Sequence, residues 1–178
     1  MKSNNINELK DILLYDDVVL SINSNIDLLF SLIPELKYMV GFDQKHPHHH
    51  LDVWQHTLLA LSFSLNDFDI RLSLLLHDIG KPFSYQDEEV RHFRNHAVVS
   101  KMMSYDILKR LDFDDDFIDK ICYLIEKHDS IITDKDVKKD YELEYKRYEI
   151  QKCDALAHNP GKLDKRIKYL YKAKKMFY

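Results

Sequence analysis

The sequence predicts an all-α fold, because apolar residues recur at helical spacing along nearly the whole chain. Only 3 glycines and 4 prolines occur in 178 residues, too few to separate the many short strands of a β fold. The length suits one domain with its own core, and no linker, repeat or low-complexity block divides it. We expect a single helical bundle over residues 1–178, with its core at about residues 45–160. N-terminal helices within residues 1–40 and a basic C-terminal helix over 162–178 should pack on that core.

The first part of the chain predicts three helices. Apolar spacing indicates two short amphipathic helices over residues 6–14 and 22–33, followed by a connection over residues 34–50. Asp52 is suited to cap the next helix, because its carboxylate can accept the free amides of a first helical turn. That helix should run over residues 52–65 and bury a stripe formed by Val53, Trp54, Thr57, Leu58 and Leu61.

A strongly apolar helix follows. It should begin at Asp67 or Asp69 and end at Leu76, and its apolar residues lie almost all round it, which indicates a central position. Gly80 and Pro82 are the expected stop signals. The remaining segments are, in order, a polar loop over 81–94, helices over 95–111 and 115–128, a mixed segment over 130–140, a helix over 141–158 and a basic helix from residue 163.

Composition bounds the class of protein. The net charge of −4 gives no general attraction to nucleic acid. No apolar run approaches the roughly 18 residues of a membrane span, and the N-terminus lacks the apolar core of a secretory signal. Cys122 and Cys153 are too few for a disulfide framework. We therefore expect a cytoplasmic protein without a membrane partner.

Six histidine and aspartate residues lie on the less polar faces of the predicted helices or at their ends. They are His56, His77, Asp78, His96, His128 and Asp154. A single residue of this kind is commonly a hydrogen-bonded core residue. Burying all six without a cation would be expensive, because each charge loses its hydration. The pattern therefore predicts a metal centre.

These residues resemble the signature of the HD-domain phosphohydrolase superfamily, which is a His, then His-Asp, then a distant Asp. The matching positions are His56, His77-Asp78 and Asp154, and the resemblance covers about residues 45–160. In that superfamily the four residues bind a divalent metal within a helical bundle. The resemblance therefore implies an HD-domain bundle with hydrolytic activity.

The likeness is closest to the HD domain of bacterial tRNA nucleotidyltransferases. It is carried by HHLDVWQHTL (49–58), LLHDIGKP (75–82), FRNH (93–96) and DALAHN (154–159). That family usually has Gly where Asn95 stands. We expect no nucleotidyltransferase head within these 178 residues, so the resemblance does not imply CCA addition and only the phosphohydrolase module carries over.

His96 and His128 match the two further histidines of binuclear members, so the resemblance implies two cations with Asp78 between them. A water between the cations would become hydroxide near neutral pH and attack phosphorus in line. Four imidazoles favour Fe, Mn, Co, Ni or Zn over Mg or Ca. Occupancy by one metal stays open, since His96 and His128 could hold the substrate instead.

Further residues have two interpretations each. Lys81 could bind a substrate phosphate or be a solvated loop lysine. His50 or His49 could protonate the leaving oxygen. The basic residues after Lys162 could follow an RNA backbone or form a solvated helix face. The remaining polar residues near the site are expected to lie in loops or to be exposed: His46, His48, His92 and Asp129.

The expected function is that of a metal-dependent phosphohydrolase, a phosphatase or phosphodiesterase acting on a nucleotide or RNA end. Hydrolysis of dinucleoside polyphosphates is an alternative within this class. A nucleotide-sensing module without turnover and an RNA-binding adaptor are alternatives from other classes. The sequence leaves the oligomeric state open.

Overall fold

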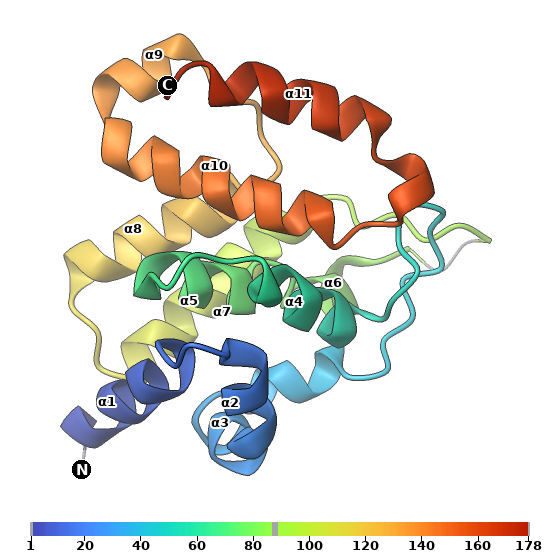
Figure 1. Cartoon of the computed structure of the whole chain (residues 1–178). Helices are drawn as coiled ribbons and strands as arrows, with labels where there is room; N and C mark the ends of the chain where they lie inside the picture. The colour runs from blue at the N-terminus through green and yellow to red at the C-terminus, as the bar shows by residue number, and fades with distance from the viewer. Residues whose placement is uncertain (1, 87–88, 178) are drawn as a thin grey trace.

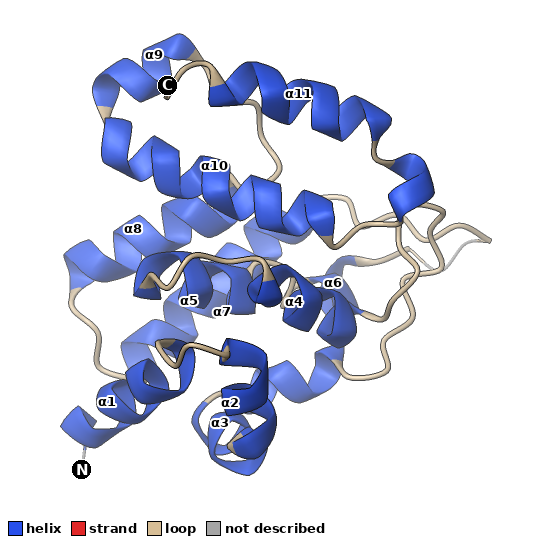
Figure 2. Cartoon of the chain, in the orientation of Figure 1, coloured by secondary structure: helices blue, strands red, loops and turns tan. Residues whose placement is uncertain are grey.

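The protein is a bundle of α-helices in a computed structural model that describes residues 2–86 and 89–177 (Figure 1). Its described residues contain no strand, only an isolated bridge between Gln86 and His92 (Figure 2). The helices are α1 (Lys2–Leu13), α2 (Val18–Ser24), α3 (Ile26–Leu32), η1 (Pro34–Met39), α4 (Val53–Ser62), α5 (Phe68–Leu76), α6 (Lys81–Ser84), α7 (His96–Arg110), α8 (Asp115–Glu126), α9 (Asp134–Lys139), α10 (Tyr141–Leu156), η2 (Pro160–Lys162) and α11 (Asp164–Lys174). The predicted all-α class is confirmed.

Side-chain caps begin the two helices that lead to the site. The carboxylate of Asp52 accepts the amide of Gln55 at 2.7 Å and starts α4. Asp67, not Asp69, does the same for α5 by accepting the amide of Ile70 at 3.0 Å. Each cap satisfies an amide that has no partner within its own helix.

The single helix predicted over residues 22–33 is wrong. The chain divides into α2 and α3 at Asn25, whose side-chain amide donates to the carbonyl of Ser21 at 2.8 Å. A short polar side chain that bonds the backbone in this way competes with the helical ladder. The connection that follows also contains a turn of 3₁₀ helix, η1, with Pro34 as its first residue.

Two segments predicted as loop or mixed contain short helices. Residues 81–94, predicted as a loop, begin with α6. Residues 130–140 contain α9, which starts with a capping box between Thr133 and Asp136. The helix predicted over residues 115–128 ends at Glu126, so its last two residues lie in the following loop.

The core surrounds α5, which contacts α1, α4, α8 and α10. Every residue of α5 from Asp69 to Leu76 is buried, as its apolar sequence predicted. In Figure 1, α1 to α3 lie on one side of α4 and α5, and α9 to α11 lie on the other. A smaller cluster joins α10 to α11 and contains Tyr148, Leu170 and Phe177. Within the described residues, no helix combines the length and apolarity needed to cross a membrane.

A buried polar network on α10 holds the loop after α8. Arg147 is 3% exposed, pairs with Glu144 at 2.9 Å and donates to three backbone carbonyls of residues 127–131 at 2.7–3.0 Å. Gln151 donates to two carbonyls of the same loop. Because the loop carries His128, these contacts fix where that imidazole lies.

Arg147→Ala should therefore destabilise the protein strongly. It leaves the buried Glu144 carboxylate without a cation and removes one donor from each of three carbonyls, of which only those of Lys127 and Ser130 keep Gln151 as a donor, so we expect a loss of about 3–5 kcal/mol in the free energy of unfolding. Urea denaturation measures this loss. Arg147→Lys keeps the charge without the planar fork and should lose less. A loss below about 1 kcal/mol for the alanine variant would show that other contacts hold the loop.

Candidate metal centre

The structure brings all six predicted ligand-type side chains together. Five of them are 5% exposed or less, and the side chain of His96 is 16% exposed. They come from five places in the fold: His56 from α4, His77 and Asp78 from the end of α5, His96 from the first turn of α7, His128 from the loop after α8, and Asp154 from α10. The helix ends therefore meet at one buried point.

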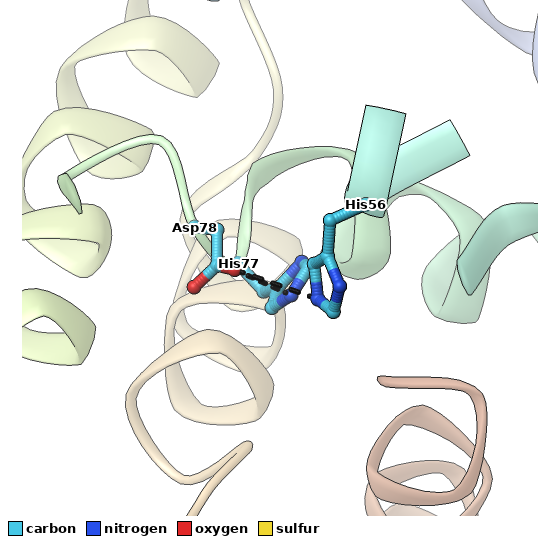
Figure 3. A group of neighbouring side chains, drawn as sticks. All are labelled: His56, His77 and Asp78. Carbon is cyan, nitrogen blue, oxygen red and sulfur yellow. Dashed lines mark ion pairs between the residues drawn. The ribbon is translucent and has the colours of Figure 1, made fainter. Parts of the chain in front are cut away.

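Asp78 lies between two groups of imidazoles. On one side, Nε2 of His77 and Nε2 of His56 lie 3.2 and 3.7 Å from its Oδ2 (Figure 3). On the other side, Nε2 of His96 lies 3.4 Å from its Oδ1 and 3.3 Å from Nε2 of His128. In each group the ligand atoms lie within 4.8 Å of one another, close enough to share one cation. Asp154 adds an oxygen 3.0 Å from Nε2 of His56.

Backbone carbonyls fix the orientation of the four imidazoles. Nδ1 of His77, His96 and His128 lies 2.7–3.0 Å from the carbonyl oxygen three residues earlier in each case. Nδ1 of His56 lies 3.2 Å from the carbonyl oxygen of Ala157. A carbonyl only accepts, so each Nδ1 carries a proton and a neutral ring presents the Nε2 lone pair to the centre. Histidines that bind metals are commonly held in this way.

The two carboxylates at the centre are held in their ionised form. Burial raises the pKa of Asp78, but the charges of His77 and Lys81 outweigh it and hold the pKa well below its usual range. Against the effect of burial, the neighbouring imidazoles likewise hold the pKa of Asp154 well below its usual range. The two carboxylates raise the pKa of His77 to about 10 against the effect of burial. Burial and the adjacent imidazoles lower the pKa of His128 to about 4. Because the two carboxylates stabilise a proton on His77, the same position would also stabilise a metal cation.

Several buried polar atoms at the centre have no hydrogen-bond partner. They include Nε2 of His77 and both carboxylate oxygens of Asp78, although Nε2 of His77 and the Lys81 ammonium lie in ion-pair contact with Oδ2 of Asp78, at 3.2 and 2.7 Å. Buried polar atoms without partners are costly and rare in folded proteins. Imidazole nitrogen and carboxylate oxygen are ligands that divalent transition metals prefer. The donor set therefore fits a metal.

Lys81 lies at the centre, whereas His50 does not. Lys81 is 4% exposed and donates to the side-chain oxygen of Gln44 at 2.8 Å, in addition to its ion pair with Asp78. It is therefore not a solvated loop lysine. His50 is exposed and lies outside the lining of the cavity at the centre, while its neighbour His49 lines it.

We call this cavity of about 230 Å³ the central cavity. Sequence reasoning missed five residues that line it: His46, Arg91, His92, Asp129 and Arg166. A guanidinium nitrogen of Arg166, on α11, lies 3.1 Å from an oxygen of Asp154. The pattern of basic residues around Arg166 gave no signal of this contact, because its partner belongs to a different helix. His46 was expected to be exposed and is only partly so.

Gly80 lets the segment that carries His77 and Asp78 pack tightly against α7. Its φ is −82°, so it lies in the right-handed region and is not required there for a left-handed turn. A Cβ at this position would lie 2.5 Å from the amide nitrogen of Ser100 and 2.9 Å from the carbonyl oxygen of His96. The amide of Gly80 also donates to the Ser100 hydroxyl at 2.9 Å. The absence of a side chain therefore sets the distance between Asp78 and His96.

Asn95 occupies the left-handed backbone region, with φ of +63°. Glycine adopts this conformation without strain, and asparagine tolerates it better than most other residues. The conformation explains why Asn95 can replace the glycine that is usual in the domains this segment resembles. His96 follows directly, so the turn at Asn95 aims that imidazole into the cavity.

Comparison with known proteins confirms the predicted family. The model of the HD domain family matches residues 48–165, more than half of the chain, and the protein belongs to this family of generally metal-dependent phosphohydrolases. A CC-adding tRNA nucleotidyltransferase of Thermus thermophilus is 34% identical over 111 residues, 58% of this chain and 25% of that protein. An A-adding tRNA nucleotidyltransferase of Deinococcus radiodurans is 33% identical over 109 residues, 57% of this chain and 25% of that protein. The chain thus spans about a quarter of the length of these relatives.

Gly80→Ala should move the segment that carries His77 and Asp78 away from α7. The new methyl group meets backbone atoms, so we expect a loss of about 1–3 kcal/mol in the free energy of unfolding. Chemical denaturation measures this loss, and metal titration should show weaker binding because His96 moves. Gly161→Ala is the matched control, since its Cβ would meet only the Asn159 side chain at 3.6 Å. Equal losses in the two variants would contradict the role given to the Gly80 contact.

Proposed function

We propose that this protein is a metal-dependent phosphohydrolase that acts on a phosphate mono- or diester of a nucleotide or an RNA end. The main observation that supports this proposal is the close approach of His96 and His128, whose Nε2 atoms lie 3.3 Å apart. Both rings use Nδ1 to bond a carbonyl, so their Nε2 lone pairs face each other. Such lone pairs repel unless a proton or a cation lies between them, and the adjacent Asp78 carboxylate favours a cation.

The ligand-type residues divide about Asp78 into two sets. His96 and His128 would complete one site, and the other three ligands would complete the second. Two divalent cations in these sites would supply an acidic water and neutralise charge that develops on a phosphate. The four imidazoles favour Fe, Mn, Co, Ni or Zn over Mg.

Other residues of the central cavity are placed to orient a phosphate. The buried ammonium of Lys81 can hold a phosphate oxygen beside Asp78, and Arg166 and Arg91 extend the positive charge along the cavity wall. His49, rather than the exposed His50, is the histidine we propose for contact with the substrate. Burial and the charge of Lys81 lower the pKa of His49, so its neutral ring would orient the phosphate or leaving oxygen by hydrogen bonding.

The relatives support a nucleotide or RNA end as substrate. Both are named as enzymes that add nucleotides to tRNA, and they match this chain over the HD region. We therefore propose a phosphoester at the end of a nucleic acid as one substrate of this chain. The same chemistry is available in free nucleotides.

Metal content and hydrolysis should depend on the same residues. We expect about two metal ions per chain in protein saturated with Mn²⁺ or Co²⁺, and hydrolysis of p-nitrophenyl phosphate or its bis ester. Asp78→Ala should lose most of the metal and lower kcat/KM by more than about a hundredfold, beyond the loss typical of an outer contact. His128→Ala should retain about one metal ion per chain.

His50→Ala is the matched control, because it removes an exposed imidazole outside the cavity. It should retain the full metal content and activity. Elemental analysis and a phosphoester panel measure both properties. Undiminished hydrolysis by Asp78→Ala would overturn the proposal, and metal binding without hydrolysis of any ester would favour a sensing module.

A further inference from the structure

We propose that a second cavity, beside the central one, binds the nucleoside and an additional phosphate of the substrate. We call it the α11 cavity, and the inference rests on the proposed hydrolysis at the central cavity. It lies between the histidine-rich loop around residues 46–49, the loop after α8 and the start of α11. Its lining shares five residues with the central cavity: His46, His49, Asp129, His158 and Arg166. A ligand with a phosphate at the centre can therefore extend into it.

The two volumes indicate how a substrate is divided between the cavities. The central cavity holds about 230 Å³, and the α11 cavity about 510 Å³. Pockets for small organic ligands span roughly 300–1,000 Å³. The central cavity falls below this range and suits a phosphate group with its cations. The larger part of a nucleotide therefore belongs in the α11 cavity.

Positive charge is available along the α11 side of this cavity. Lys162 and Lys165 line it, and neither pairs with an acid in the part of the chain that the structure describes. Arg166 bonds Asp154 through one guanidinium nitrogen, while its buried Nε has no hydrogen-bond partner. Such cations suit a phosphate in addition to the one that is hydrolysed.

Another part of the lining is apolar and fixed. The hydroxyl of Tyr169 accepts the amide of Ile132 and donates to Gln151, both at 2.9 Å. Its polar end is thus satisfied, and what remains for a ligand is the aromatic ring. Ile131 is 71% exposed and lines the cavity beside it. A planar base can pack on such a surface without needing a specific hydrogen bond.

A nucleoside that carries two phosphates matches all of these features. One phosphate would lie in the central cavity, the base would pack on Tyr169 and Ile131, and the second phosphate would meet Lys162 and Lys165. This assignment gives part of the basic C-terminal segment a role at the site. Lys168 and Lys172, further along α11, are exposed and lie outside the lining.

Steady-state kinetics with the full chain and Mn²⁺ test the assignment. Adenosine 3′,5′-bisphosphate should have a KM roughly tenfold below that of adenosine 3′-monophosphate, because of the second charged contact. Replacing both lysines, Lys162→Ala with Lys165→Ala, should remove this difference with kcat nearly unchanged. Hydrolysis of p-nitrophenyl phosphate, which reaches neither lysine, should not change.

The matched control replaces Lys168 and Lys172 of α11 with alanine, which removes the same charge from the same basic C-terminal segment. It should leave the KM of the bisphosphate unchanged. Equal KM values for the two adenosine substrates in the wild type would overturn the inference. So would equal effects of the two double variants, because they would indicate general electrostatic attraction without a binding cavity.

Binding of adenosine 3′,5′-bisphosphate, measured by calorimetry, separates this inference from the proposed function. If no phosphoester is hydrolysed, the proposed function fails, and loss of binding in the Lys162/Lys165 variant alone still supports the cavity. Lysine-dependent binding of a single-stranded oligonucleotide, with no binding of mononucleotides, would overturn the inference in favour of an RNA backbone.

Discussion

The cost of burying ionisable groups is the constraint on which the rest of this structure depends. Five ligand-type side chains at the centre are 5% exposed or less, so each has lost most of its contact with bulk water. Backbone carbonyls accept hydrogen bonds from the Nδ1–H groups of the four imidazoles. The Nε2 lone pairs and the oxygens of Asp78 then remain for a cation. Each carbonyl that bonds a ring lies near a helix end, so the positions where helices begin and end also determine the geometry of the centre.

The packing around the centre holds each ligand-bearing segment separately. The buried helix α5 carries His77 and Asp78, and Gly80 presses the following turn against α7. Arg147 and Gln151 on α10 fix the loop that carries His128. These contacts are close-packed or buried and polar, so small changes in them are expected to move ligand atoms. The bundle thus holds the imidazole and carboxylate donor atoms in defined positions.

The parts of the fold that local sequence determines could be predicted, and those that depend on distant partners could not. Helical periodicity and the caps at Asp52 and Asp67 are local signals, as is a His-Asp pair after an apolar helix. Lys81 is buried because Gln44 and Asp78 receive its ammonium, and only the fold brings Gln44 there. Within the irregular histidine-rich loop no periodicity distinguishes His49, which lines the cavity, from the exposed His50. The break at Asn25 comes from one side-chain bond that competes with an otherwise helical pattern.

Anomalous diffraction from crystals grown with Mn²⁺ or Co²⁺ tests the metal centre most directly. We expect one peak on each side of Asp78, the first near Nε2 of His56 and His77 and the second near Nε2 of His96 and His128. The metal–nitrogen distances should be about 2.0–2.3 Å, the usual range for divalent transition metals. A map without a peak beside Asp78, with the His96 and His128 rings still facing each other across 3.3 Å, would contradict a metal centre.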